Sequence, residues 1–145
     1  MNRTVLAIAT VALGVTAVAA QSDPIASRKA LMKANGDQAK IGAAMAKGEA
    51  PFDLAKAKAI FVTFAEAAEK VPNLFPENSK TGGETAAAAR IWEDTADFKA
   101  RFVKFLTDAK AAGSDVKDFA SFKDTFSVVA KNCSGCHELY KIKKS

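Results

Sequence analysis

The sequence predicts an all-α protein, an antiparallel, up-down-up-down four-helix bundle. Ala, Lys, Glu and Leu, which favour helices, fill long stretches that contain no proline, and the alternation typical of strands is scarce. Helix-capping residues, glycines and prolines bound four such stretches of about 20 to 28 residues. Most of the connections are short, so consecutive helices should lie side by side and run in opposite directions.

The first helix is expected to run from about Asp23 to Lys47. Asp23 suits the N-cap because its carboxylate can accept a hydrogen bond from a free backbone N–H of the first turn. Pro24 suits the first helical position, where no backbone donor is needed. Gly48 then ends the helix.

The second helix is expected to begin near Asp53 and to end before Pro72. Its apolar residues recur at helical spacing and define one buried face. This face consists of Leu54, Ala57, Phe61, Phe64, Ala68 and Val71. The stretch "PNLFPENSKTGGET" follows and reads as a loop, because it contains two prolines and a Gly-Gly pair.

The third helix is expected over residues 85–112, with Thr85 at its start and Gly113 at its end. Trp92 and the phenylalanines of this region are predicted to pack in the core. The buried side consists of Trp92, Thr95, Phe98, Phe102, Phe105 and Ala109.

The fourth helix is expected to begin near Ser114 or Asp115. Its apolar positions are spaced alternately by three and four residues, which is the spacing of a seam that faces other helices. The seam consists of Phe119, Phe122, Phe126, Val129, Cys133, Cys136 and Tyr140. Both cysteines of the chain therefore lie on the core-facing side.

Residues 1–20 have the layout of a cleaved secretory signal peptide. Arg3 precedes a long run of apolar and small residues, and small residues end the segment near Ala20. The alternative, a retained membrane anchor, is disfavoured because the run is short for a span of roughly 20 apolar residues. Cleavage would leave residues 21–145 as one domain without stable membrane insertion.

The charge of the chain is mildly positive and dispersed. The chain has 21 basic and 16 acidic residues, and removal of Arg3 lowers the net charge from +5 to +4. A nucleic-acid-binding protein would concentrate its positive charge on one surface, so that class is not expected. The charge is compatible with a weak attraction to acidic protein partners.

The two cysteines and the single histidine are gathered in "CSGCH", residues 133–137. A structural zinc site would need four ligands, and the chain has neither a second cysteine pair nor a second histidine. A thiol-exchange site would place the reactive cysteine at a helix N-terminus near strands, whereas this pair lies deep in a predicted helix. Both alternatives are therefore disfavoured.

Covalent haem attachment explains the spacing of this cluster, because Cys-x-x-Cys-His is its signature. Each residue of a helix advances by about 100°, so Cys136 lies about 60° from Cys133 on one side and His137 about 40° on the other. Two sulfurs on one face can form thioethers with a porphyrin, and the adjacent imidazole can reach the iron. Export through a signal peptide agrees with attachment outside the cytoplasm.

A helical bundle with this motif in its last helix resembles the class II c-type cytochromes, the cytochrome c′ family. The stretches "SRKALMKANG", "AKGEAPFD", "LFPENS", "GGET" and "IWEDTADF" agree with the family along most of residues 21–145. The resemblance implies a periplasmic domain with one covalently attached haem c, with Cys133 and Cys136 as thioether anchors and His137 as the proximal iron ligand. Class I cytochromes c fit poorly, because their motif lies near the N-terminus.

The sixth ligand divides this family. Cytochromes c′ proper leave the distal face open behind an apolar or aromatic residue four positions after an arginine, whereas low-spin relatives have methionine there. In this sequence the arginine is Arg28 and the later position is Met32. Met32 and Met45 lie about 140° apart around the helix, so both cannot face one haem. The resemblance thus implies Met32 as the distal ligand and assigns Met45 to the core or an interface.

The expected function is single-electron transfer between redox proteins of the periplasm, without catalysis. The alternative is a five-coordinate cytochrome c′ that binds nitric oxide or carbon monoxide at an open distal face; a thiol-based redox protein is a more distant possibility. Arg28 and Thr85 are candidate contacts of the haem propionates. The alternative for Arg28 is a solvated helix residue, and for Thr85 it is a simple N-cap, which is favoured over a propionate contact. Lys141 stands where the family commonly has arginine. A homodimer and a monomer both remain open.

Overall fold

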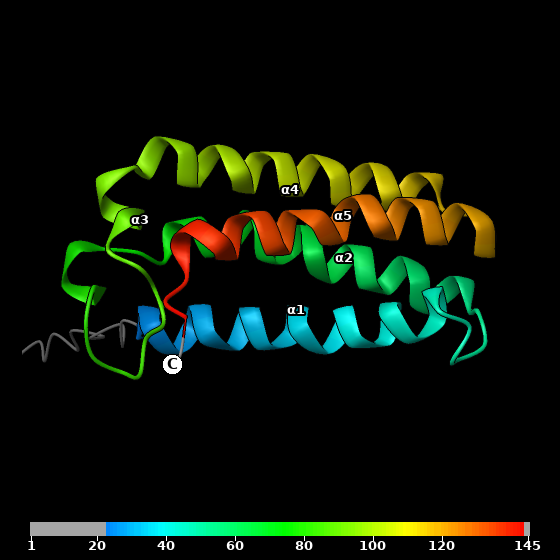
Figure 1. Cartoon of the computed structure of the whole chain (residues 1–145), viewed down its shortest axis with the longest axis horizontal. Coiled ribbons are helices and arrows are strands. Elements are labelled where there is room, and N and C mark those ends of the chain that lie inside the picture. Colours follow the sequence, from blue (N-terminus) through cyan, green and yellow to red (C-terminus); the bar gives the residue numbers. More distant parts are fainter. Residues whose placement is uncertain (1–22, 144–145) are drawn as a thin grey trace, which may run out of the picture.

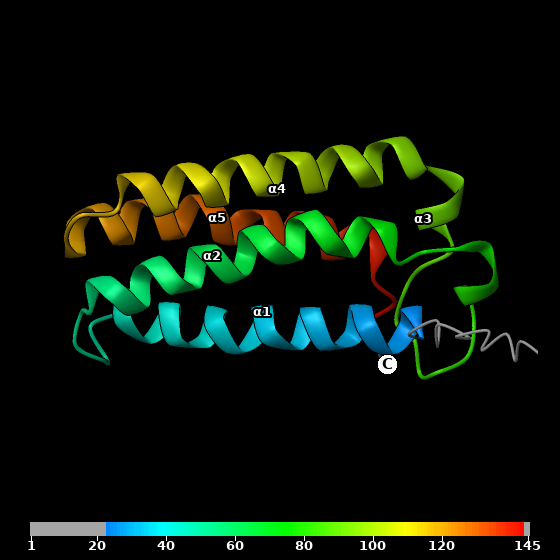
Figure 2. The same ribbon diagram turned by 180° about the vertical axis from the view of Figure 1, so that it is seen from behind.

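The structure is a computed structural model that describes residues 23–143. Four long helices lie alongside one another in an antiparallel bundle, which confirms the predicted fold class (Figures 1 and 2). They are α1 (Pro24–Ala46), α2 (Leu54–Lys70), α4 (Thr95–Asp115) and α5 (Phe119–Tyr140). The short helix α3 (Arg90–Glu93) and two 3₁₀ turns, η1 (Val71–Asn73) and η2 (Glu77–Ser79), lie in the long connection at one end of the bundle.

The first two helices begin at the predicted caps. The carboxylate of Asp23 accepts a hydrogen bond from the backbone N–H of Ile25 at 2.8 Å, and that of Asp53 accepts one from Lys56 at 3.0 Å. Gly48 follows α1 with a φ of 75°, a left-handed conformation that glycine adopts without steric cost. The starts of α1 and α2 and the end of α1 were therefore predictable from local chemistry.

The prediction of one uninterrupted third helix is wrong. Asp94 has φ −129° and ψ 59°, and its carboxylate accepts a hydrogen bond from the N–H of Asp97 at 3.2 Å. Asp94 thus caps a new helix, α4, and separates it from α3. Aspartate competes for backbone donors in this way because its side chain is short and polar. Residues 85–89 are not helical, so Thr85 does not begin a helix.

The predicted turn between the last two helices is displaced along the chain. Helix α4 continues through Gly113 to Asp115, and α5 begins only at Phe119. Asp118 and Ser121 form a reciprocal capping box, with the Ser121 N–H donating to the Asp118 carboxylate at 2.8 Å. Phe119, placed at the start of the seam, is 41% exposed, and the buried seam begins at Phe122.

The core at the far end of the bundle, away from α3, is built from aromatic rings. Phe122 is central: its ring centroid lies 5.8 Å from that of Phe52, 6.0 Å from Phe61 and 5.4 Å from Phe126. Gly42 of α1 lies against this cluster, and a Cβ atom there would overlap the Phe126 ring. The α1 backbone therefore packs directly against an α5 side chain at this end.

The other end is closed by the loop and the C-terminal segment. The N–H of Ile142 donates to the carbonyl of Ala86 at 2.8 Å, and the N–H of Ala88 donates to that of Tyr140 at 3.0 Å. These bonds flank an isolated antiparallel bridge between Ala87 and Lys141. Within residues 23–143, no helix is long and apolar enough to span a membrane.

Candidate haem site

A cavity of about 150 Å³ lies between α1, α4 and α5, in the half of the bundle nearer to the C-terminus. Cys133, Cys136 and His137 of α5 all line it, as their helical spacing predicts. Its complete lining is Met32, Asn35, Gly36, Ala39, Arg101, Phe102, Phe105, Asn132, Cys133, Cys136 and His137.

Helix α1 supplies the wall on the other side of the cavity from α5. Met32, Asn35, Gly36 and Ala39 recur at intervals of three or four residues and so share one face of α1. A Cβ atom added at Gly36 would meet nothing within 4 Å, which shows that the α1 backbone borders open space here. Met45 is only 2% exposed and belongs to the hydrophobic core, in agreement with the predicted angular separation of the two methionines.

The residues of this cavity fit a covalently held haem. Two thiols could attach a porphyrin covalently, and an imidazole and a thioether are groups that could ligate its iron. Phe102, Phe105 and Ala39 supply apolar wall suited to a macrocycle. The buried Oδ1 atom of Asn35 has no hydrogen-bond partner, and unsatisfied buried polar atoms are frequent at ligand sites.

The cavity borders the least extensive of the four contacts between neighbouring long helices, the contact of α1 with α5. It is smaller than typical ligand clefts of roughly 300–1,000 Å³. Helix α1 packs much less extensively against α5 than α2 does against α4. A flat group can therefore be accommodated between α1 and α5 with less loss of native packing than between any other two neighbouring long helices.

The ionisation of the cluster agrees with ligation rather than thiol exchange. Burial raises the pKa of the Cys133 and Cys136 thiols, and the nearby Arg101 offsets this only in part for Cys136. Reactive exchange cysteines instead have a lowered pKa. Burial, followed by the charge of Lys141, lowers the pKa of His137, which favours the neutral imidazole that binds metals.

The geometry gives no support to the zinc alternative. In the part of the chain that the structure describes, no three His, Cys, Asp or Glu side chains converge on a point where they could hold a metal ion. The two sulfurs and the imidazole are instead distributed along one wall of the cavity. Such a spread suits the periphery and centre of a macrocycle better than a single ion.

Arg28 and Thr85, the candidate propionate contacts, meet each other outside the cavity. Arg28 is 4% exposed, which excludes the reading of a solvated helix residue. Its guanidinium donates to the hydroxyl of Thr85 at 2.8 Å, to the hydroxyl and carbonyl of Ser79 at 2.8 Å each, and to the carbonyl of Leu74 at 2.9 Å. Arg28 thus fixes the loop to α1, and its contact with a propionate stays a prediction.

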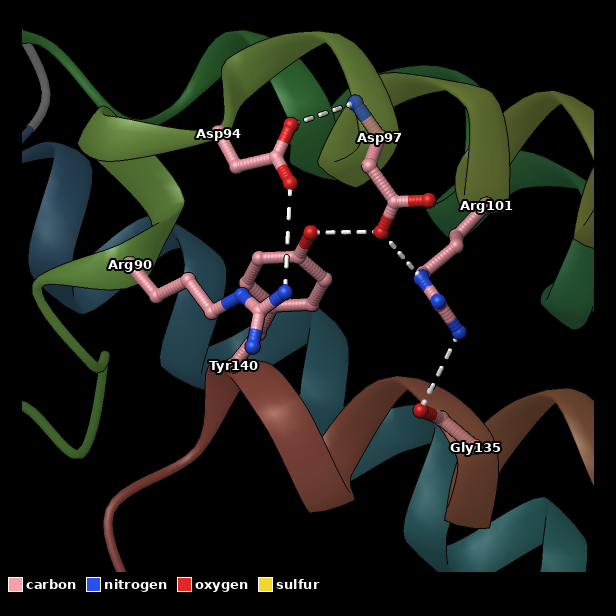
Figure 3. A network of polar contacts seen from close by, with 6 residues as sticks. All are labelled: Arg90, Asp94, Asp97, Arg101, Gly135 and Tyr140. Atoms are coloured by element: carbon pink, nitrogen blue, oxygen red, sulfur yellow. Dashed lines mark hydrogen bonds and ion pairs between the residues drawn. The ribbon is translucent and has the colours of Figure 1, made fainter.

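Three residues that line the cavity were not predicted from the sequence, namely Asn35, Asn132 and Arg101, of which Arg101 alone is charged. Its Nε donates to the carboxylate of Asp97 at 2.6 Å, and one Nη donates to the carbonyl of Gly135 at 3.3 Å (Figure 3). The Tyr140 hydroxyl donates to the same Asp97 oxygen at 2.6 Å. The four-residue spacing of Asp97 and Arg101 signals an ion pair. Only the register of α4 against α5 places that pair beside the Cys-x-x-Cys-His turn.

Comparisons with known proteins agree with this site. The family model described as Cytochrome C′ matches residues 23–141. A cytochrome c′ of Rhodopseudomonas palustris is 46% identical over 97% of this chain and 99% of its own length. A cytochrome c-556 of Agrobacterium fabrum is 38% identical over 83% of this chain and 82% of its own.

Solved structures place the fold in the same group. The structure of the cytochrome c′ from R. palustris superposes with a TM-score of 0.83 at 46% identity, covering 86% of this chain and 100% of that one. A structural model of oxidised R. palustris cytochrome c556 superposes with a TM-score of 0.78 at 29% identity, covering 86% and 100%. The chain therefore belongs to the cytochrome c′ family and is a mono-haem, electron-carrying c-type cytochrome with one covalently attached haem c.

Proposed function

We propose that this protein carries single electrons in the periplasm through a low-spin iron with two protein ligands. Cys133 and Cys136 are the thioether anchors, His137 is the proximal ligand and Met32 is the distal ligand. The observation that carries the proposal is that Met32 on α1 and His137 on α5 line the same cavity from different helices.

The bound haem supplies the one-electron chemistry, and a thioether ligand favours its reduced state relative to a second histidine or an open site. The residues that line the cavity would hold it and limit the access of water, with Phe102 and Phe105 of α4 as apolar wall and the two cysteines of α5 as covalent anchors. With both axial positions filled from the protein, an electron can be gained or lost with little rearrangement. No coordination position is left for a substrate.

The relatives support this proposal and also one alternative. The 38%-identical cytochrome c-556 favours the low-spin branch of the family. The 46%-identical cytochrome c′ favours the alternative, an iron with an open distal face that binds nitric oxide or carbon monoxide. The Met32 thioether distinguishes the two functions, because an open face requires Met32 to stay unbound.

Export is part of the proposal, although residues 1–20 lie outside the described residues. The solved R. palustris chain is covered completely by 86% of this chain, which is about 125 of 145 residues. That is the length expected after cleavage near Ala20. Redox proteins of the same compartment are the proposed partners. The possible homodimer stays a prediction that mass measurement under native conditions can check.

The test compares two volume-conserving substitutions in the exported holoprotein, Met32→Leu and Met45→Leu. Visible spectra are recorded for the oxidised, reduced and carbon monoxide-treated forms. We expect sharp low-spin bands without a carbon monoxide response for the native protein and for Met45→Leu. For Met32→Leu we expect broad high-spin bands that shift with carbon monoxide, because only this substitution removes an iron ligand.

Two results would contradict the proposal. A native protein with high-spin bands that respond to carbon monoxide would establish the alternative function. Low-spin bands in Met32→Leu would show that another group is the sixth ligand. The intact mass of the native protein provides a separate check, since an attached haem adds the mass of a porphyrin and leaves no titratable thiol.

A further inference from the structure

Arg101 is the single side chain with a permanent charge among the described residues that line the haem cavity. Its position is fixed from several directions. The Asp97 carboxylate accepts from its Nε at 2.6 Å, the Gly135 carbonyl accepts from one Nη at 3.3 Å, and the Tyr140 ring centroid lies 5.8 Å from its guanidinium carbon. Two helices therefore hold one cation at the edge of the cavity (Figure 3).

The contact with Gly135 connects this cation to the haem attachment turn itself. Gly135 lies between Cys133 and Cys136, so its carbonyl belongs to the turn that carries both sulfurs. A Cβ atom at Gly135 would lie 4.0 Å from the Arg101 guanidinium, which shows how near the side chain runs to this backbone. A displacement of Arg101 relative to α5 would thus alter the attachment turn, that is, residues 133–137, which contain both cysteines and His137.

Asp97 is charged as well, but it is further removed from the cavity. It is not among the lining residues; its carboxylate accepts hydrogen bonds from Arg101, which lines the cavity, and from Tyr140, which does not. The hydrogen bonds from Arg101 and Tyr140 lower the pKa of Asp97, and the hydrogen bond to Asp97 raises the pKa of Arg101. Both groups are ionised at neutral pH, with the cation nearer to the cavity than the anion.

We propose that Arg101 is a positioning residue that raises the reduction potential of the haem, and that Asp97 opposes it. This inference rests on the haem site proposed above. Reduction adds one negative charge to the haem, and a fixed cation at the cavity edge stabilises that charge. The side chain of Arg101 is 36% exposed, so solvent screens the effect only in part. Asp97 lowers the potential by the same electrostatic argument, but from a greater distance.

The experiment measures the reduction potential of the holoprotein by spectroelectrochemistry in Arg101→Gln, Arg101→Lys and Asp97→Asn. We expect Arg101→Gln to lower the ferrous-to-ferric ratio at a fixed applied potential by about threefold to tenfold, where tenfold equals about 59 mV for one electron. Arg101→Lys keeps the charge and should retain most of the native potential. Asp97→Asn should raise the potential, because Asn still accepts hydrogen bonds but no longer carries a negative charge.

Arg90→Gln is the matched control. Arg90 also contacts the Tyr140 ring, at 5.9 Å, and its loss changes the net charge equally, but it does not line the cavity. We expect Arg90→Gln to shift the ratio by less than about twofold, because its charge is exposed and screened. A shift as large as that of Arg101→Gln would mean that net charge alone matters, and the proposal would fail.

The directions in which Arg101→Gln and Asp97→Asn shift the reduction potential distinguish an electrostatic role from a merely structural one. If Arg101 and Asp97 only hold the attachment turn in place, both substitutions loosen the same turn and move the potential in the same direction. Equal directions would therefore overturn the proposal. Should Arg101→Gln yield no holoprotein, Asp97→Asn and Arg101→Lys still decide it. The native spectrum and intact mass test the haem site independently, so failure of one proposal is distinguishable from failure of the other.

Discussion

The two halves of α1 carry the same kinds of residue and use them in opposite ways. Met32 and Gly36 border the haem cavity, and a Cβ atom at Gly36 would touch nothing. Met45 and Gly42, further along the helix, are buried, and a Cβ atom at Gly42 would collide with Phe126. One helix thus closes the core at one end and leaves room for a ligand at the other.

This difference separates stability from function along the length of the bundle. At the far end, tilted aromatic rings pack against one another and Gly42 of α1 lies directly against the Phe126 ring. At the cavity end, polar contacts through Arg28 and Asp97 hold the elements together where side-chain packing is incomplete. Substitutions at equivalent residue types in the two halves should therefore have different consequences.

The methionine pair should show the greatest contrast in stability. Met45→Ala leaves a cavity in a closely packed core and should lower the free energy of unfolding by about 2–5 kcal/mol. Its visible spectrum should stay native. Met32→Ala should instead change the spectrum while removing less packing, because Met32 is only partly buried. Denaturant titration with parallel spectra checks both, and equal losses of stability would contradict the contrast.

The glycine pair should differ by about 2 kcal/mol and in sign. Before haem attachment, Gly36→Ala gains helix propensity without a clash against protein atoms, so the free energy of unfolding of the haem-free chain should rise by about 0.5–1 kcal/mol. Gly42→Ala makes the same propensity gain but forces the Phe126 ring to move, for a net loss of about 1–2 kcal/mol. Chemical denaturation of the two variants under identical conditions measures the difference. A stabilised Gly42→Ala would show that this end of the bundle is looser than described.

The polar network at the cavity end should make part of the stability depend on pH. Asp97 has a pKa lowered below its ordinary value of 3.8 by hydrogen bonds from Arg101 and Tyr140. Its stabilising contribution is therefore complete above that value and is lost as the pH falls below it. The difference in the free energy of unfolding between the native protein and Asp97→Asn should be constant near neutrality and should shrink below about pH 4.

Asp37→Asn serves as the control for this measurement. The pKa of Asp37 is also lowered, by its exposed partner Lys33 one turn away on α1. Since that pair makes no contact between helices, we expect a smaller difference for it than for Asp97. A difference for Asp97→Asn that does not change with pH would show that its charge contributes nothing to the network.

The sequence was sufficient for features that depend on local chemistry. The caps at Asp23 and Asp53 are confirmed, and the angular argument correctly placed Met45 in the core, away from the cavity that Met32 lines. The prediction from sequence failed where two local conformations compete. At Asp94 the side chain caps a new helix and so interrupts a region rich in helix-forming residues. The haem-site residues themselves stay predictions until spectra are measured.

Features that depend on the register between helices could not be predicted. Nothing in the spacing of residues shows that Arg28 meets Ser79 and Thr85, which lie far along the chain in an irregular loop. In the same way, Arg101 reaches Gly135 only because of how α4 is aligned with α5. Such contacts require the tertiary structure, since loop conformation and helix register have no simple sequence pattern.

The position of the attachment motif in α5 has a consequence for how the protein matures. A chain is synthesised from its N-terminus, so the segments of α1, α2 and α4 are made before the motif. The cavity lies between α1, α4 and α5, and of the contacts between neighbouring long helices the α1–α5 contact separates with least loss of packing. The final helix should therefore receive its haem while still undocked, with closure against α1 as the last step of assembly.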